Sequence, residues 1–229
     1  MIGDPVALTV RRKFSRPDKR LIAAFHDAPT GFITDAFNGQ GCLDGRIKPL
    51  LRGTRICGPA LTCYCAPTDL LAAMAALDYA RKGDVIVIAA GGDETAAVVG
   101  DRWAYWAKKI GVAGVVVDGL ARDLPGLVDA GLPIFARGIR PNSGFKNGPG
   151  EINTRVACGG IAVEPGDIIV GDQDGVIAIP QTRAREVAAQ LKLVAKKEAT
   201  LDAELRQAKS ARFWNEPALK ARGAIRFLD

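Results

Sequence analysis

Two continuous apolar runs limit what this chain can fold into: residues 85–90 read VIVIAA and residues 112–117 read VAGVVV. Apolar runs of this length without alternation are typical of strands buried on both faces of a sheet. The segment 95–109 between them has a mostly helical pattern, with a second interpretation in which a loop is followed by a new helix at Gly100. The order strand, helix, strand predicts a β-α-β unit at the centre of the fold.

Weaker patterns on either side place further elements around this unit. We predict helices over 16–28, 68–81, 124–130 and 181–209, strands over 55–65 and 133–136, long turns over 138–160 and a β meander over 161–180. The tail holds Phe213, Trp214 and Phe227, with a break at Pro217. Together these elements predict a mixed α/β domain rather than a simple Rossmann fold. Because no linker is visible, we expect one domain over 1–229, with a core over about 20–180 and a C-terminal helical extension over about 181–229.

Composition and charge exclude several classes of protein. The net charge of +6 is dispersed, and no basic surface interleaved with aromatic residues is visible, so we do not expect nucleic-acid binding. No apolar run approaches the roughly 20 residues that span a bilayer, and the start MIGDPVALTVRRKF lacks a secretory pattern. The sequence also contains neither G-x-G-x-x-G nor G-x-x-x-x-G-K-[ST]. We therefore expect a cytoplasmic protein without a membrane partner or a phosphate loop.

The five cysteines do not form a recognisable metal pattern. Their number is odd, and Cys63 and Cys65 are separated by one residue instead of the two that are usual in structural zinc sites. We expect reduced thiols that are mostly buried, with a zinc or disulfide role as the alternative.

Candidate catalytic side chains are few. The single histidine, His26, falls on an N-terminal helix, which excludes a histidine-rich zinc site and leaves it with an expected structural role. Arg122 and Asp123 directly follow the second apolar strand, at the end where α/β proteins bind ligands. An arginine there can bind a carboxylate, and an aspartate can hold a hard divalent cation that keeps several waters. The alternative is an ion pair on the surface.

Asp101 stands at the start of the preceding helix segment, 21 positions before Arg122. Because a helix and a strand separate the two residues, the crossover would return Asp101 to the same end of the sheet. The helix start at 100–103 also offers free N–H groups to an anion.

These residues resemble the signature of a known family. Asp101, twenty further residues and then Arg122-Asp123 are similar to the D-x20-R-D pattern of the 4-hydroxy-4-methyl-2-oxoglutarate aldolases, class II pyruvate aldolases that share the fold of the regulator of ribonuclease activity A. The segments that continue the resemblance are Gly83–Val87, Gly111–Gly119, Pro133–Ala136, Val163–Ile169 and Asp172–Val176. The resemblance implies a single mixed-sheet domain of the swivelling β/β/α type with flanking N- and C-terminal helices.

The resemblance also implies roles for individual residues. Asp123 would bind the metal, Mg²⁺ or Mn²⁺, directly or through its waters, and Arg122 would bind the oxo and carboxylate oxygens of the substrate. Backbone N–H groups of Gly100, Asp101, Arg102 and Trp103 would bind the carboxylate of pyruvate, and Asp101 would position a water. The family often has a smaller residue in place of Trp103.

The aldolase branch of this family has a long C-terminal helix, and the predicted helix over 181–209 is consistent with that branch. Glu198 stands where a catalytic glutamate would reach the site of a neighbouring subunit in a homotrimer or homohexamer. The substrate would be 4-hydroxy-4-methyl-2-oxoglutarate or 4-carboxy-4-hydroxy-2-oxoadipate, and oxaloacetate would be decarboxylated through the same pyruvate enolate.

Three alternatives stay open. The first is a non-catalytic regulator that binds a ribonuclease or another protein. The second is an enzyme of the same fold with another 2-oxo acid or another lyase or hydrolase reaction. The third is a Schiff-base lysine in place of a metal, although Lys108 and Lys109 are expected on a solvated helix face, without the apolar setting such a lysine needs.

Overall fold

The computed structural model describes residues 6–207 and 216–228. It contains two compact units, Met1–Val194 and Ala195–Asp229. The boundary lies within helix α6 (Ala184–Gln207), so the first turns of that helix belong to the core unit. The expectation of one domain over the whole chain stays a prediction.

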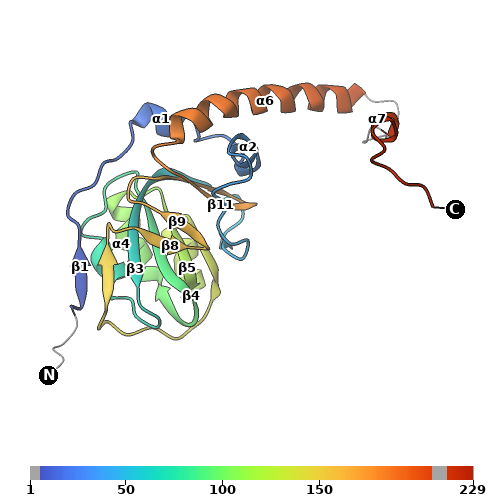
Figure 1. Cartoon of the computed structure of the whole chain (residues 1–229). Helices are drawn as coiled ribbons and strands as arrows, with labels where there is room; N and C mark the ends of the chain where they lie inside the picture. Colours follow the sequence, from blue (N-terminus) through green and yellow to red (C-terminus); the bar gives the residue numbers. More distant parts are fainter. Residues whose placement is uncertain (1–5, 208–215, 229) are drawn as a thin grey trace. The chain divides into compact units, whose positions relative to one another are not determined.

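A large mixed sheet forms the centre of the core unit. Among the described residues, its main path runs in the order β1 (Leu8–Val10), β7 (Gly150–Ile152), β3 (Ile56–Cys65), β4 (Val85–Val99), β5 (Gly114–Ala121), β6 (Ile134–Ile139) and β2 (Lys48–Pro49). The pairs β3–β4, β4–β5 and β5–β6 are parallel, and Figure 1 shows β3, β4 and β5 together at the centre. The predicted β-α-β unit is therefore confirmed, with α4 (Asp101–Ile110) as its crossover helix.

Different layers cover the two faces of this sheet. One face packs against buried residues of three helices, α3 (Leu71–Ala76), α4 and α5 (Leu124–Ala130). The other face packs against a small antiparallel pair, β8 (Val156–Cys158) and β9 (Ile161–Val163). Helices on one side and strands on the other confirm the expected mixed α/β fold.

Strand β3 joins this sheet to a second layer of strands. Its first half pairs with β10 (Ile168–Asp172), which forms a hairpin with β11 (Gly175–Ile179), and its second half pairs with β4. The strand changes partner at Gly58-Pro59, where a Cβ on Gly58 would lie 2.3 Å from the carbonyl oxygen of Gly83. The Gly58-Pro59 step therefore does not interrupt β3, and it allows this strand to pair with β10 in its first half and with β4 in its second half.

The helices near the two ends of the core unit pack on the hairpin. They are α1 (Lys19–Ala23), α2 (Thr30–Ala36) and the first turns of α6, and the shared cluster includes Phe25, Ile33 and Val187. The helix predicted over 16–28 is thus shorter, because α1 ends at Ala23 and turns follow it. Over the described residues, no helix is both long enough and apolar enough to cross a membrane.

Three further expectations need correction. Residues 95–99 belong to β4 and not to a helix, because Ala97 and Val99 pair with β5 after a bulge that begins beyond Ala89. Of the second interpretation, the new helix at Gly100 is confirmed, with Gly100 as its N-cap, but a strand and not a loop precedes it. The expected meander over 161–180 is only a hairpin, since β9 pairs with β8, and the turns over 138–160 contain β7 and β8.

The second unit holds the end of α6 and helix α7 (Glu216–Ala221). Pro217 stands in the first turn of α7, where backbone N–H groups have no partner within the helix. The N–H group that proline lacks is therefore not needed there, and Pro217 does not break the helix. Phe227 is exposed, and Phe213 and Trp214 lie outside the described residues.

Replacing Asp172 by alanine is expected to lower the free energy of unfolding at pH 7 by about 2 kcal/mol. Burial favours the neutral carboxyl, but hydrogen bonds from the hydroxyl and N–H of Thr30 (2.6 and 2.8 Å) and the N–H of Asp174 (3.0 Å) outweigh it and lower the pKa of Asp172. A group whose folded pKa is lowered stabilises the protein above its unfolded pKa of about 3.9, and this stability is lost as the pH falls through the folded value.

Urea unfolding at several pH values measures this effect. The difference in stability between wild type and D172A should shrink as the pH falls below about 4. A difference that stays constant down to the acid limit of folding would contradict the assigned role of the carboxylate.

Candidate functional site

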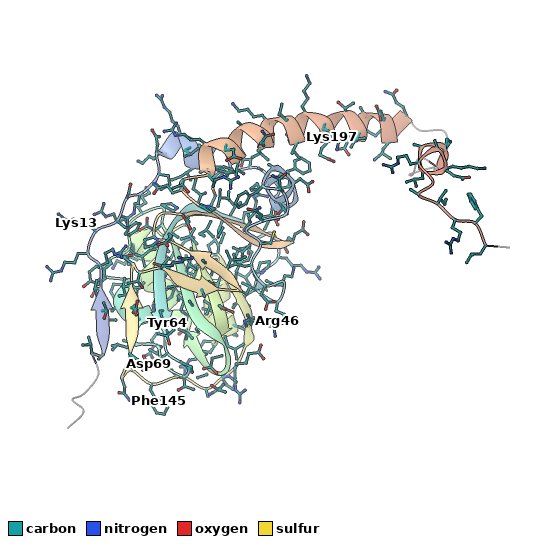
Figure 2. All side chains as sticks on the ribbon, viewed as in Figure 1. Lys13, Arg46, Tyr64, Asp69, Phe145 and Lys197 are labelled. Carbon is teal, nitrogen blue, oxygen red and sulfur yellow. The ribbon has the colours of Figure 1, made fainter. Side chains whose placement is uncertain are left out.

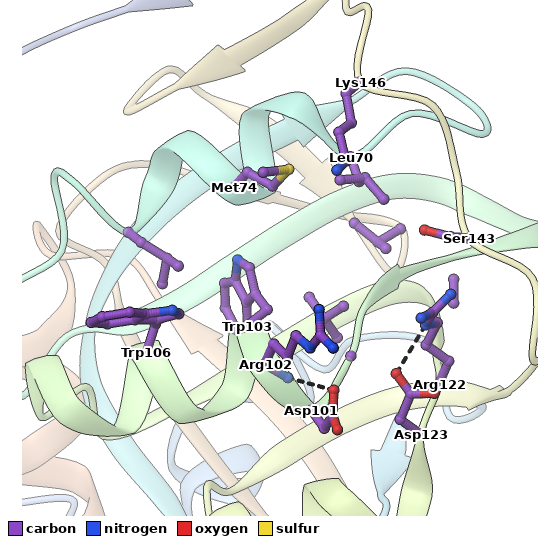
Figure 3. A pocket seen from close by; sticks show the side chains of 15 residues that line it. Leu70, Met74, Asp101, Arg102, Trp103, Trp106, Arg122, Asp123, Ser143 and Lys146 are labelled. Carbon is purple, nitrogen blue, oxygen red and sulfur yellow. Dashed lines mark hydrogen bonds and ion pairs between the residues drawn. The ribbon is translucent and has the colours of Figure 1, made fainter.

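A pocket of about 610 Å³ opens where the carboxyl ends of β4 and β5 meet the start of α4 (Figure 3). It is lined by Leu70, Met74, Leu77, Ala97, Val98, Val99, Gly100, Asp101, Arg102, Trp103, Trp106, Arg122, Asp123, Ser143 and Lys146. Six residues selected from the sequence, Gly100 to Trp103 together with Arg122 and Asp123, therefore lie around one space.

Arg122 and Asp123 are held at the end of β5 by backbone geometry. The N–H of Arg122 donates to the carbonyl oxygen of Val99 on β4 (3.0 Å), which extends the strand pairing by one residue. Asp123 has a left-handed backbone (φ 62°, ψ 46°) and precedes α5 as its N-cap. Such a conformation is uncommon for a residue other than glycine, although aspartate adopts it more readily than most side chains. It turns the chain sharply so that the Asp123 carboxylate accepts from Nε of Arg122 (2.9 Å).

Both side chains are accessible from the pocket. The side chains of Arg122 and Asp123 are 37% and 36% exposed, so the ion pair between them is neither sealed in the core nor fully in solvent. A guanidinium in this position keeps further N–H groups for an anion, and the carboxylate keeps oxygen lone pairs for a cation.

The start of α4 forms the opposite wall. Gly100 is its N-cap, and the carbonyl oxygen of Gly100 accepts from the N–H of Ala104 (3.0 Å). The N–H of Arg102 donates to the carboxylate of Asp101 (2.6 Å), so one of the four backbone donors expected to bind an anion already has a partner. The binding of an anion by these N–H groups stays a prediction, in which the Arg102 N–H would exchange the Asp101 carboxylate for the ligand.

Asp101 lies between the starts of α4 and α5. A Cβ on Gly126 would be 2.5 Å from the Cβ of Asp101, so the glycine in α5 allows the two helices to approach this closely. The crossover from α4 through β5 therefore returns Asp101 to the end of the sheet that carries Arg122, as the sequence predicts.

Gly100 is required by the close approach of this wall to Arg122 and Asp123. A Cβ at this position would lie 2.8 Å from Oδ2 of Asp123 and 3.2 Å from Cγ of Arg122. The backbone of Gly100 is extended (φ −139°), so an alanine would fit the conformation and would disturb only these two side chains.

For the aldolase activity that the resemblance implies, replacing Gly100 by alanine is expected to lower kcat/KM by about 100-fold, because a displacement of about 1 Å in a catalytic group can cost this much. The melting temperature should change little, since the displaced atoms belong to side chains that border open space. Pyruvate release and thermal unfolding of the two proteins measure the two effects. Gly31→Ala is the matched control, because nothing lies within 4 Å of the Cβ it adds. A G100A variant with wild-type turnover would contradict the requirement for glycine beside Arg122 and Asp123.

Trp103 has a structural role in addition to lining the pocket. Its side chain is buried, and its Nε1 donates to the carbonyl oxygen of Ala73 in α3 (2.7 Å). The indole therefore joins α4 to α3 and presents only its ring to the pocket.

Sequence reasoning missed the remaining lining residues on α3 and its flanks, on the second turn of α4, and on the loop after β6. They are Leu70, Met74, Leu77, Trp106, Ser143 and Lys146. None of them belongs to a local pattern, so no sequence signal could have placed them beside Arg122.

A buried carboxylate holds the loop that carries Ser143 and Lys146. Asp69 accepts from the N–H groups of Asn147 (2.7 Å) and Gly148 (2.9 Å), and the N–H of Phe145 donates to the carbonyl oxygen of Thr68 (2.7 Å). Figure 2 shows Asp69 and Phe145 close together at the edge of the core unit. This loop completes the rim of the pocket.

The other sequence candidates lie elsewhere. His26 is exposed and pairs with Asp27 (2.8 Å), as a structural residue would, and all five cysteines are free. Burial raises the pKa of Cys57 to about 12. Glu198 lies on α6 in the second unit and is not among the residues that line the pocket, so its role stays a prediction.

The site can accommodate a divalent cation of the magnesium type. Magnesium keeps several waters and needs only one or two protein carboxylates, and Asp123 provides one in this pocket, which Asp101 also lines. Among the described residues no group of three or more His, Cys, Asp or Glu side chains is arranged to hold a metal.

The structure is that of a mixed α/β protein with a pocket at the carboxyl ends of parallel strands. Residues 26–178 match the family model described as RraA-like, Aldolase/RraA. The chain therefore belongs to the RraA-like family, and the resemblance seen in the sequence is confirmed.

The similar proteins include one named as an aldolase and two solved structures described as RraA proteins. A protein of Halalkalibacterium halodurans named "Putative 4-hydroxy-4-methyl-2-oxoglutarate aldolase" is 43% identical over 173 residues, which cover 76% of this chain and 82% of the relative. The solved structure of Streptomyces coelicolor RraAS2, described as an unusual member of the RNase ES inhibitor RraA protein family, has a TM-score of 0.70 at 28% identity and covers 85% of this chain and 97% of its own. The RNA-processing inhibitor RraA from Thermus thermophilis has a TM-score of 0.62 at 27% identity, with 67% and 93% covered.

Proposed function

We propose that this protein is a divalent-metal-dependent aldolase. It would cleave 4-hydroxy-4-methyl-2-oxoglutarate or 4-carboxy-4-hydroxy-2-oxoadipate to pyruvate and a second oxo acid, and it would also decarboxylate oxaloacetate. The single observation that carries this proposal is the convergence of Arg122, Asp123 and the start of α4 on one pocket. The name of the 43% identical relative supports the same reaction.

The chemistry needs positive charge beside one oxygen. Cleavage of the bond between carbons 3 and 4 of a 4-hydroxy-2-oxo acid leaves the pyruvate enolate, whose developing negative charge is the main barrier. Arg122 can donate to the oxo and carboxylate oxygens at the same time, and the free N–H groups at the start of α4 can bind the carboxylate. Held in this way, the oxo group lies where the guanidinium stabilises charge as it develops.

A divalent cation would be held by Asp123, directly or through its waters, with Asp101 beside it. When bound, it supplies Lewis-acid stabilisation to the same oxygen. Asp101 can also hold the water that takes the proton from the hydroxyl on carbon 4. Decarboxylation of oxaloacetate passes through the same enolate and needs no base, so one site can support both reactions.

A Schiff-base mechanism would require a lysine in the pocket. Lys108 and Lys109 do not line the pocket, and the lysine that does line it is Lys146. Lys108 instead donates to the carbonyl oxygen of Gly131 (2.8 Å). Lys146 is exposed on a loop and lacks the desolvated setting that makes a lysine nucleophilic. The pocket therefore favours the metal-dependent mechanism.

The proposed oligomer is a homotrimer or homohexamer in which Glu198 of one subunit reaches the site of the next. This part of the proposal rests on the resemblance and on the length of α6, which continues to Gln207.

One assay tests the proposal directly. The protein is incubated with oxaloacetate or 4-hydroxy-4-methyl-2-oxoglutarate, with and without Mg²⁺, and pyruvate is coupled to lactate dehydrogenase. Pyruvate release that depends on Mg²⁺ is expected, and none above background with either substrate would overturn the proposal.

The second candidate function is that of a non-catalytic regulator of a ribonuclease. The titles of the two solved relatives favour it, since both refer to an inhibitor of RNA processing or of an RNase. Measured binding to RNA-degradation proteins, together with absence of pyruvate release, would support this function instead.

A further inference from the structure

The proposed reaction leaves two cationic side chains of the pocket without a role. Three such side chains line the pocket, and of these Arg122 pairs with Asp123 (2.9 Å). The other two, Arg102 and Lys146, form no ion pair with a carboxylate of any described residue. In Figure 3 they extend into the pocket from different walls, Arg102 from the start of α4 and Lys146 from the loop after β6. Both charges are therefore available to an anionic ligand.

The loop that carries Lys146 is held on both sides of this residue. The N–H of Phe145 donates to the carbonyl oxygen of Thr68 (2.7 Å). The N–H of Asn147 donates to the carboxylate of Asp69 (2.7 Å), which is buried. The Lys146 ammonium group, at the end of a flexible aliphatic side chain, therefore extends from a fixed point on the rim of the pocket. Because the loop backbone is already held, a ligand that binds there does not have to order it.

The same two walls offer further hydrogen-bond donors. The guanidinium of Arg102 carries several N–H groups, and none of them donates to a described residue. The hydroxyl of Ser143, on the same loop as Lys146, points into the pocket in Figure 3. A carboxylate accepts several hydrogen bonds through its oxygens, and the bonds from charged donors are the stronger ones. These walls are therefore suited to binding a carboxylate.

The balance of charge in the pocket favours a substrate with more than one carboxylate. The charged lining consists of three cations and two carboxylates, namely Arg102, Arg122, Lys146, Asp101 and Asp123. A divalent cation held by Asp123 would increase the excess of positive charge. The carboxylate of the pyruvate unit offsets only part of this excess, so a second carboxylate on the substrate is attracted by the charge that remains.

The pocket also has room for a substrate longer than pyruvate. In the proposed reaction Arg122 and the start of α4 hold the pyruvate unit, so carbon 4 and its substituents must extend into the remaining space. The pocket volume of about 610 Å³ lies in the range of roughly 300–1,000 Å³ that is typical of small-molecule sites, and a three-carbon unit fills only part of it. Arg102 and Lys146 border this space, so they are the cations that a carboxylate on carbon 4 would meet.

We propose that Arg102 and Lys146 bind a carboxylate carried by carbon 4 of the substrate, so that the site selects 4-hydroxy-2-oxo diacids over the corresponding monoacids. This inference rests on the proposed aldolase function and assigns the recognition of the second acidic group to these two residues. A hydrogen bond to a charged group contributes roughly 10- to 100-fold to affinity, so the loss of both cations should be measurable.

Kinetics with a matched pair of substrates test this assignment. 4-Hydroxy-4-methyl-2-oxoglutarate carries a carboxylate on carbon 4, and 4-hydroxy-4-methyl-2-oxopentanoate carries a methyl group in its place. The ratio of their kcat/KM values is compared between the wild type and the double variant R102Q/K146Q, so that the different intrinsic reactivities of the two substrates cancel. The ratio of diacid to monoacid should fall at least about tenfold in the variant.

The double variant R12Q/K13Q is the matched control, because it removes the same charge from exposed residues that do not line the pocket. Its ratio should equal that of the wild type. Both variants should keep the wild-type melting temperature, since Arg102 and Lys146 are exposed as well. An unchanged ratio in R102Q/K146Q would overturn the inference. Equal losses with the two substrates would also overturn it, because the two cations would then act on the pyruvate unit or on another part of the protein.

A binding measurement separates this inference from the proposed function. Calorimetry with Mg²⁺ present compares 2-oxoglutarate with 2-oxopentanoate, which differ by the same replacement and lack the hydroxyl group that cleavage requires. At least about tenfold tighter binding of 2-oxoglutarate, lost in R102Q/K146Q, would support the carboxylate site even if no substrate released pyruvate, a result that would overturn only the proposed function. Pyruvate release without tighter binding of 2-oxoglutarate would leave the aldolase standing and overturn this inference.

Discussion

Replacing Asp123 by asparagine is expected to remove at least about 1000-fold of the Mg²⁺-dependent pyruvate release, because the loss of a bound cation withdraws several kcal/mol of charge stabilisation. Asparagine is a better replacement than alanine here. Asp123 has a φ of 62°, and asparagine adopts this left-handed conformation more readily than other residues apart from glycine. The shape of the turn before α5 should therefore persist.

Two measurements keep this result interpretable. Calorimetric titration with MgCl₂ should show binding to the wild type and strongly weakened binding to D123N, independently of turnover. Asp129→Asn is the matched control, since Asp129 lies on α5, is exposed and does not line the pocket. Retained turnover in D123N with an unchanged melting temperature would refute the metal role of Asp123.

Replacing Arg122 by lysine is expected to lower kcat/KM about 100-fold, within the range of roughly 100- to 1000-fold that the loss of one oxyanion donor costs. Lysine keeps the positive charge but cannot donate to two oxygens from one plane, and it cannot keep the contact of Nε with Asp123 in the same geometry. The loss of kcat/KM should therefore be large even though the positive charge is kept.

Steady-state kinetics with oxaloacetate measure this loss. Arg185→Lys, at an exposed position of α6 outside the pocket, is the matched control and should retain wild-type values. If R122K and R185K are equally active, Arg122 does not stabilise the enolate.

The part of the site formed by Arg122, Asp123 and Asp101 could be predicted because these residues directly continue regular elements. Arg122 and Asp123 come immediately after a buried strand, and Asp101 begins the helix before that strand. Once the parallel arrangement is recognised, the crossover connection places these three residues at one end of the sheet. Their roles in catalysis stay predictions for the experiments above.

The rest of the pocket lining could not be predicted in the same way. Met74 and Lys146 are 72 positions apart in the chain, and only the packing of α3 and the anchoring of the loop by Asp69 bring them to one pocket. Trp103 is a large aromatic residue on a helix, and no local pattern shows that its indole nitrogen bonds to Ala73.

The continuation of β4 to Val99 is a similar case. Residues 95–99 have the composition of a helix start, yet they pair with β5 because Ala97 and Val99 find buried partners there. Pairing with a distant strand outweighed local preference, which contributes only tenths of a kcal/mol per residue.

The sequence by itself determined the two central buried strands, the crossover between them and the acidic and basic residues at their ends, because each depends on the order of neighbouring residues along the chain. Only the tertiary structure decided the close contact of Gly100 with Arg122 and Asp123, the hydrogen bond from Trp103 to Ala73 and the meeting of Met74 and Lys146 in one pocket. The physical reason is that these features arise from contacts between segments far apart in sequence, whose energies no local pattern records.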